Sequence, residues 1–71
     1  MIGSKMILKI KQNNSWRFID GIQDVTTPIL EETVPKEVFI RYTRNGEHLT
    51  QNVLEGCYLL NDLGKTIEKI S

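Results

Sequence analysis

Apolar and polar residues alternate at the start of the chain. Met6, Leu8 and Ile10 fall on one side of an extended backbone, and lysines occupy most of the other side. This period of two predicts a half-buried β-strand over residues 5–11. The lysines at positions 5, 9 and 11 are interpreted as charges that protect an edge strand against aggregation.

A second alternating run follows the turn cluster Gln12-Asn13-Asn14-Ser15. Over residues 15–22, Trp16 and Phe18 share one face of the strand, while Arg17 and Ile19 share the other. The two runs together predict a β-hairpin that turns at the asparagines. Gly21 is expected to mark a bulge or the end of the second strand.

The strongest turn signal in the chain is Asn45-Gly46, between the alternating runs of residues 37–44 and 47–54. Asn-Gly is typical of two-residue hairpin loops. With this turn, the expected partners on the apolar face are Tyr42 with Leu49, Ile40 with Gln51, and Val38 with Val53. The opposite, largely polar face pairs Thr43 with His48, Arg41 with Thr50, and Phe39 with Asn52. With this register, the mostly apolar pairs lie on one face and the largely polar pairs on the other, as a half-buried hairpin requires.

Residues 58–70, YLLNDLGKTIEKI, allow two interpretations. A helix would place two glycines in its interior, each costing about 1 kcal/mol relative to alanine. A hairpin instead uses Asp62-Leu63-Gly64 as a three-residue loop, with Gly64 in the left-handed position of a bulge. It pairs Leu59 with Ile67, and Tyr58 with Glu68. The hairpin is preferred, and a helix confined to residues 63–70 is the alternative.

Residues 23–36 interrupt the β pattern. Thr27 precedes Pro28, and acidic residues follow at positions 31 and 32, an order typical of a helix start. Pro35 prevents extension much beyond Thr33. We therefore expect one short helical turn near residues 28–33, or an irregular loop.

These elements predict an all-β fold. We expect a small antiparallel meander of five to six strands, forming an SH3-like barrel or a curled sheet, with one short helical turn near residues 28–33. The 71 residues form a single small β domain, in which residues 1–5 are interpreted as a leader or tag. Because so short a chain buries only about 60% of its unfolded surface, self-association into a homo-oligomer is expected.

Composition narrows the function classes. The chain contains no alanine, which favours strands, and its nine basic and nine acidic residues cancel. Nonspecific nucleic-acid binding, which draws on clustered positive charge, is therefore not expected. No apolar run reaches the roughly 18 residues of a membrane span, and the N-terminus lacks a secretory signal. The lone cysteine suits a reducing compartment, so we expect a cytoplasmic protein without membrane association.

The sequence offers little for catalysis. His48 and Cys57 are the single histidine and the single cysteine. A Cys57–His48 pair is conceivable, but a cysteine in a strand is more often a packing residue. Neither a metal-ligand spacing nor a phosphate-binding glycine loop is present. We expect a protein that is not an enzyme and that uses no metal or cofactor.

Arginine and aromatic residues provide the candidate binding groups. Guanidinium groups and aromatic rings suit phosphates and bases. If the second and third strands lie close together, Arg17 and Arg41 would converge on one sheet face. The competing structural interpretation, which is preferred, places Trp16, Phe18 and Phe39 in the core and leaves the arginines solvated or paired with glutamates. The candidate ligand-binding residues are Trp16, Arg17, Arg41, Tyr42, Arg44 and Tyr58.

The stretch YLLND-x-GKTIE at residues 58–68, in a short chain rich in Lys, Ile and Asn, resembles small uncharacterised proteins of phages and prophages of Gram-positive bacteria. The resemblance implies an accessory protein that binds a host macromolecule, a virion component or a signalling nucleotide in the host cytoplasm. Two functions follow as expectations. The first is a non-enzymatic interaction module that self-associates and binds another protein. The second is a nucleotide- or phosphate-binding protein that sequesters its ligand, with Trp16, Arg41 and Arg44 as a clamp.

Overall fold

Strands and the turns between them make up residues 5–32, 34 and 36–71, which are the residues that this computed structural model describes. Of the expected leader or tag at residues 1–5, only Lys5 is among them. The strands are β1 (Met6–Gln12), β2 (Ser15–Val25), β3 (Ile29–Glu31), β4 (Glu37–Arg44), β5 (Glu47–Asn52), β6 (Cys57–Leu60) and β7 (Thr66–Lys69).

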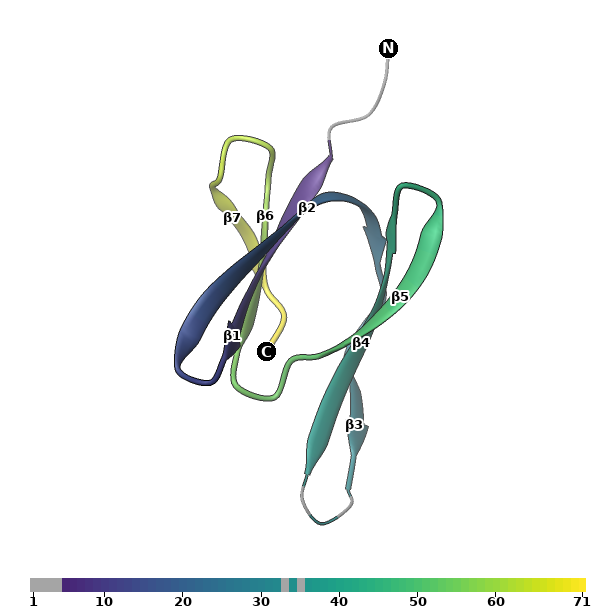
Figure 1. Ribbon diagram of the computed structural model, residues 1–71, viewed down its shortest axis with the longest axis vertical. Helices are drawn as coiled ribbons and strands as arrows, with labels where there is room; N and C mark the ends of the chain where they lie inside the picture. Colours follow the sequence, from purple (N-terminus) through teal and green to yellow (C-terminus); the bar gives the residue numbers. More distant parts are fainter. Residues whose placement is uncertain (1–4, 33, 35) are drawn as a thin grey trace.

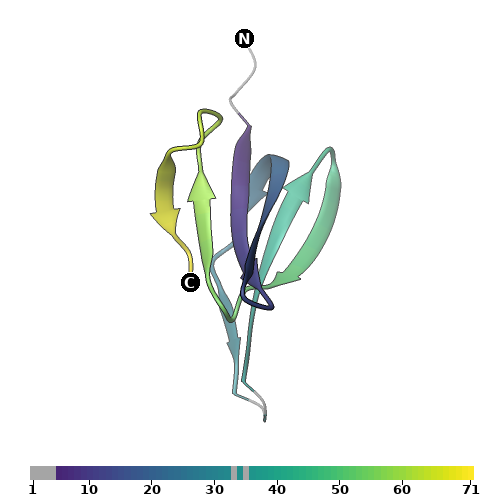
Figure 2. The ribbon, with the colours of Figure 1, turned by 60° about the vertical axis from the view of Figure 1, so that its left-hand side comes forward.

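All seven strands belong to one antiparallel sheet. Six follow each other in the order β3-β4-β2-β1-β6-β7, and β5 pairs with β4. Figure 1 shows the sheet curling into a half-barrel, with β4 and β5 on one side and β1, β6 and β7 on the other. The all-β prediction, as a curled sheet, is confirmed. β3 and the start of β4 project beyond the half-barrel as a two-stranded ribbon (Figure 2), and the molecule measures 45 × 23 × 17 Å along its principal axes.

The first hairpin forms as the sequence predicts. Gln12 pairs with Ser15, and both intervening asparagines have positive φ, which asparagine tolerates better than most residues. The register shifts between Met6 and Leu8, opposite Gly21, so the expected bulge is present. Beyond the bulge, β2 continues to Val25 and leaves β1 to pair with β4. The bulge thus allows one long strand to serve both sides of the half-barrel.

The second hairpin confirms the expected register. Tyr42 pairs with Leu49, Ile40 with Gln51, Thr43 with His48, Arg41 with Thr50, and Phe39 with Asn52. Val53 N–H donates to the Val38 carbonyl at 2.7 Å, which extends the same register past the end of β5. Asn45 and Gly46 have φ of 52° and 80°, as a two-residue loop of this kind requires.

The prediction of a helical turn near residues 28–33 is wrong. Residue 33 lies outside the described residues. Residues Ile29–Glu31 form strand β3, and Ile29 pairs with Phe39 while Leu30 pairs with Val38. Adjacent apolar residues that each find a cross-strand apolar partner favour a ribbon over a single isolated helical turn. Before the ribbon, the Thr26 N–H and the Thr26 hydroxyl both bond the backbone of Arg41. The start signal at Thr27-Pro28 therefore marks a break between β2 and β3.

The C-terminal stretch is a hairpin, so the helical alternative is wrong. Asn61 N–H donates to the Lys65 carbonyl at 2.8 Å around the loop, and Gly64 has φ of +84°. The expected pairing is wrong by one residue, because Leu59 pairs with Glu68 and Tyr58 pairs with Lys69. The register shift leaves Ile67 as an extra residue on β7. After the bulge, the Ile70 N–H donates to the Cys57 carbonyl, and the Ile70 side chain packs against the core.

The core occupies the concave side of the sheet. It is built from the buried residues Leu8, Ile10, Ile19, Ile22, Ile40, Tyr42, Val53, Cys57 and Leu59. The interpretation that placed Trp16, Phe18 and Phe39 in the core is wrong, since Trp16 is 42% exposed, Phe18 is 62% exposed and Phe39 is only half-buried. Because Leu8 pairs with Ile19, it is Ile19 that turns toward the core, and its neighbour Phe18 faces outward.

Candidate functional site

An aromatic and basic surface lies on the convex side of the sheet, opposite the core. Side chains that are directly paired across antiparallel strands share one face. Lys69 on β7 pairs with Tyr58 on β6, Tyr58 pairs with Lys9 on β1, and Lys9 pairs with Phe18 on β2. Lysine and aromatic residues therefore alternate across four strands. Lys11 and Trp16 pair in the next row. We call this surface the aromatic–lysine face: Lys9, Lys11, Trp16, Phe18, Tyr58 and Lys69.

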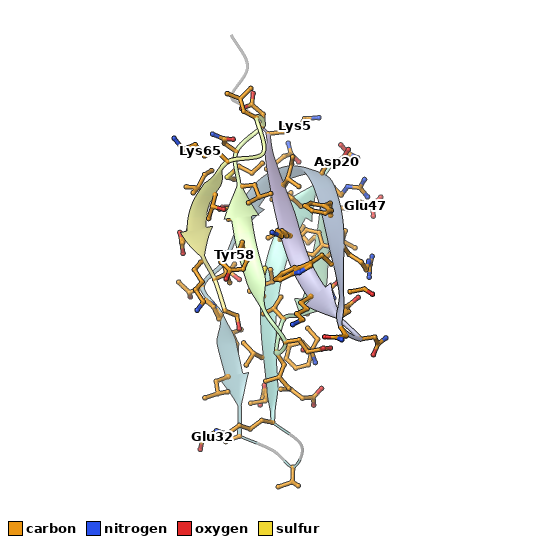
Figure 3. All side chains as sticks on the ribbon, turned by 90° about the vertical axis from the view of Figure 1, so that its left-hand side faces the viewer. Lys5, Asp20, Glu32, Glu47, Tyr58 and Lys65 are labelled. Carbon is orange, nitrogen blue, oxygen red and sulfur yellow. The ribbon has the colours of Figure 1, made fainter. Side chains whose placement is uncertain are left out.

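Trp16 organises the centre of this face. Its ring centroid lies 5.9 Å from that of Tyr58, so the indole spans β1 to reach β6. Lys9 Nζ lies 4.7 Å from the Trp16 ring centroid and 5.8 Å from that of Tyr58, and Lys11 Nζ lies 5.9 Å from Trp16. Cation–π contacts of this kind contribute about 0.5–1 kcal/mol each at exposed sites. Figure 3 shows Tyr58 midway along the side of the molecule that carries β6 and β1.

The lysines of this face do not protect an edge. β1 lies between β2 and β6, so it is an interior strand of the sheet, and the edge-strand interpretation of Lys5, Lys9 and Lys11 is wrong. Lysine on the outer face of a central strand has no role in preventing edge pairing. Lys9 and Lys11 instead lie on the convex face of an interior strand.

The structure does not bring the predicted arginines together. Arg17 lies near the β1–β2 turn, where its Nη1 donates to Gln12 Oε1 at 2.8 Å. Arg41 lies beside Thr26, past the opposite end of β2, so Arg17 and Arg41 do not converge. Arg44 is engaged with Asp20, donating to its carbonyl at 2.8 Å and to its carboxylate at 2.9 Å. Within one chain, Trp16 is therefore remote from Arg41 and Arg44.

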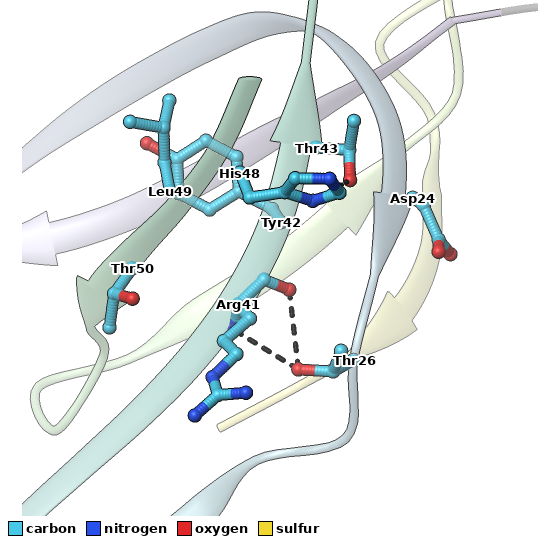
Figure 4. Close-up of a pocket in the computed structure, with 8 residues that line it drawn as sticks. All are labelled: Asp24, Thr26, Arg41, Tyr42, Thr43, His48, Leu49 and Thr50. Carbon is cyan, nitrogen blue, oxygen red and sulfur yellow. Dashed lines mark hydrogen bonds between the residues drawn. The ribbon is translucent and has the colours of Figure 1, made fainter. Parts of the chain in front are cut away.

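Arg41 and Tyr42 line an open pocket of about 570 Å³ at the β4–β5 ribbon. Figure 4 shows Thr26 Oγ1 bonded to the backbone N–H and carbonyl of Arg41, with the guanidinium pointing away from the His48 ring. His48 Nδ1 lies 3.2 Å from Thr43 Oγ1. Asp24 and Arg41 both line this pocket, which therefore carries charged groups of both signs. Tyr42 is itself largely buried and serves the core.

The projecting ribbon carries the second notable surface. We call it the arm: β3, the first three residues of β4, and Glu32, Val34 and Lys36 between them. Ile29 is 44% exposed, Leu30 is 52% exposed, and Val34 is fully exposed. Since successive strand residues face opposite sides, each face of this ribbon presents one exposed apolar residue, Ile29 on one face and Leu30 on the other. Glu31, Glu32 and Glu37 make the arm acidic.

Cys57 and His48 do not form a pair. Cys57 is fully buried in the core on β6, and burial raises the pKa of its thiol to about 11. His48 is exposed on β5, on the outer face that it shares with Thr43. Across residues 5–32, 34 and 36–71, no group of three or more His, Cys, Asp or Glu side chains is placed to hold a metal ion. In the same part of the chain, no helix is long and apolar enough to cross a membrane.

No protein-family model, curated protein or solved structure shows significant similarity to this chain.

Trp16 and Tyr58 were among the candidate binding residues predicted from the sequence, whereas Phe18 and the lysines that lie beside them in the structure were not. A signal for these residues was present. Once Gln12 and Ser15 close the first hairpin, Trp16 must oppose Lys11 and Phe18 must oppose Lys9. The lysines lie on the outer face of their strand, so the two aromatic rings have to lie there too.

Proposed function

We propose that this protein is a non-enzymatic interaction module that self-associates and binds another protein through the arm. The observation that supports this is the exposure of Ile29, Leu30 and Val34 on a ribbon that projects beyond the half-barrel. A two-stranded ribbon is marginally stable by itself in water, so an arm of this kind gains from a partner that covers it.

Burial of the arm contributes part of the driving force, and main-chain pairing at the edge of β3 adds to it. Fully burying a leucine or isoleucine side chain contributes about 1.5–3 kcal/mol. Ile29 and Leu30 are each about half exposed, so each retains roughly 1 kcal/mol that a partner can recover. The half-buried Phe39, which pairs with Ile29, widens the apolar contact, whereas Val38 packs against the core.

The free edge of β3 is the preferred docking point among the sheet edges. β7 carries a bulge at Ile67, and bulges discourage edge pairing. β5 is regular, but its sequence EHLTQN is mostly polar. β3 has no bulge, consists of Ile-Leu-Glu, and pairs only with β4 among the described strands. Main-chain pairing at such an edge is the β-augmentation mode of recognition.

A second copy of the chain is the proposed occupant of this edge. Two antiparallel β3 strands related by a two-fold axis bury the same surface on each copy and form a closed dimer. Another protein would bind in place of the second copy, by pairing a strand of its own with the edge of β3. We further propose a cytoplasmic setting, because of the single buried thiol, and an origin in a phage or prophage, from the resemblance at residues 58–68.

Sedimentation velocity across micromolar concentrations tests the proposal. The wild type is expected to sediment as a dimer, and Leu30→Lys is expected to be monomeric, because the substitution places a charge in the apolar contact. Leu63→Lys is the matched control, since Leu63 is 88% exposed in the β6–β7 loop and lies off the arm. A wild type that is monomeric throughout this range contradicts the proposal, as does a Leu63→Lys variant that dissociates equally.

A further inference from the structure

We infer that the aromatic–lysine face is a binding site for single-stranded nucleic acid. Bases would stack on the exposed rings of Trp16 and Phe18, and phosphates would contact the lysines between and beside the rings. The site is separate from the arm and from the pocket at Arg41, and it goes beyond the proposed function.

The alternation of ring and charge carries this inference. Across the sheet the order is Lys69, Tyr58, Lys9 and Phe18, with Lys11 and Trp16 in the neighbouring row. A single strand presents the same alternation, because each nucleotide joins an aromatic base to an anionic phosphate. Proteins that bind single strands without sequence preference combine aromatic stacking surfaces with a basic track for the backbone.

Exposure of the rings agrees with a stacking role. Phe18 is 62% exposed and Trp16 is 42% exposed, although the core is built without either of them. The two lie on the same face of β2 and are separated by one residue, which places them about 7 Å apart along the strand. Rings so placed can receive successive bases. The Lys9 and Lys11 ammonium groups lie over the Trp16 ring, so a base that stacks there takes their place and the lysines turn toward its phosphate.

The balance of charges over the whole chain does not oppose this site. Charges at the surface act over a Debye length of about 8 Å at physiological salt, so the local arrangement decides phosphate binding. Lys9, Lys11 and Lys69 gather on this face, whereas three glutamates lie on the arm. Two acidic groups border the face. The Glu55 carboxylate accepts the Asn13 N–H at 3.0 Å, and Asp20, two residues after Phe18 on β2, is paired with Arg44 at 2.9 Å.

A single strand fits this face better than a duplex or an acidic peptide. The bases of a duplex are stacked on each other and cannot lie on Trp16 or Phe18. A run of acidic residues would satisfy the lysines but would leave both rings without a stacking partner. A single-stranded nucleic acid contacts both the aromatic rings and the lysines of this face.

Fluorescence of Trp16, the single tryptophan, gives a direct readout. Titration with an oligothymidylate of about ten nucleotides is expected to quench Trp16 emission. Three phosphate contacts predict a slope of about −2 for log K against log salt, or roughly 20-fold weaker binding at about 200 mM than at about 50 mM salt. Lys9→Gln should reduce the size of this slope by about 0.7.

Matched variants separate stacking from general charge. Phe18→Ala is expected to weaken binding at least fivefold, or by about 1 kcal/mol, while the control Leu63→Ala leaves it unchanged. Lys65→Gln, which removes a lysine from the β6–β7 loop, is the charge control for Lys9→Gln. Both Phe18 and Leu63 are exposed, so circular dichroism of the variants should match that of the wild type. Leu30→Lys should bind the oligonucleotide normally, because its defect is confined to self-association.

Several results would overturn the inference. One is the absence of quenching at about 50 mM salt. Another is equal affinity for the duplex form, since stacking on the rings would then have no part. A third is equal quenching by an oligoglutamate peptide, which would identify the face as a site for acidic protein segments.

Discussion

Cys57 shows how burial sets chemistry at the scale of one residue. Its backbone lies between Ile10 on β1 and the C-terminal residues, and its side chain is fully excluded from solvent. Desolvation disfavours the thiolate and raises the pKa of the thiol from 9.0 to about 11. A thiol held in this state is a packing group, because the nucleophilic form is the thiolate.

This shift makes stability depend on alkaline pH. The unfolded chain releases the thiol proton near pH 9.0, whereas the folded chain keeps it to about pH 11. The contribution to stability is therefore fully present below about pH 9 and is lost as the pH rises toward 11, by about 2–3 kcal/mol in total. Urea unfolding of wild type and Cys57→Ala should show this extra loss in the wild type alone. Parallel pH profiles for the two proteins would contradict the assignment.

Residues 16 and 18 show where sequence reasoning fails at this scale. Each face of the first half of β2 carries at least one apolar residue, so alternation alone does not say which face is buried. Aromatic residues offer the larger area for burial, which favours the face of Trp16 and Phe18 when the sequence is considered alone. Cross-strand pairing buries the other face of β2. Ile19 pairs with Leu8 and therefore joins Leu8 and Ile10 on the concave side.

At the scale of elements, the hairpin of β6 and β7 depends on a bulge. A regular ladder would pair Leu59 with Ile67, but the structure pairs Leu59 with Glu68. The asparagine at the start of the loop accounts for part of this arrangement, since Asn61 Oδ1 accepts the N–H groups of both Leu63 and Lys65. The extra residue then exposes Ile67 and brings Ile70 against the core.

Two alanine substitutions distinguish the bulged from the regular ladder. Ile70→Ala should cost about 1–3 kcal/mol in the free energy of unfolding, because it removes a group that packs on the core. Ile67→Ala should change this free energy by no more than about 0.5 kcal/mol, because Ile67 is 54% exposed. Chemical denaturation measures both. The opposite ranking of the two variants would support the regular ladder.

Three hairpins could be predicted from the sequence, because the residues of each turn determine its conformation. Asn13-Asn14, Asn45-Gly46 and Gly64 each demand positive φ and so fix a hairpin. The strand β3 and the bulge at Ile67 were not predictable, because both arise from pairing with distant residues. The start signal at Thr27-Pro28 is real but is overridden when Ile29 and Leu30 find apolar partners on β4.

At the scale of the molecule, the arm and the convex face differ in their charge. Figure 3 shows Glu32 at the far end of the arm, and Lys5 and Lys65 at the opposite end of the molecule. The arm is acidic and apolar, while the convex side carries lysines and rings. A chain with zero net charge thus presents two surfaces of different chemistry, which composition alone conceals. Strand pairing gathers the rings and lysines on the convex face, and the projection of β3 and the start of β4 sets the arm apart from it (Figure 2).

Mapping both events on one ¹⁵N-labelled sample tests the existence of two independent binding surfaces most directly. Raising the protein concentration should shift the amide resonances of arm residues such as Leu30 and leave those of Lys9 and Phe18 in place. Adding oligothymidylate at fixed concentration should do the reverse. Shifts that fall on one shared set of residues in both titrations, or on neither surface, would contradict the account.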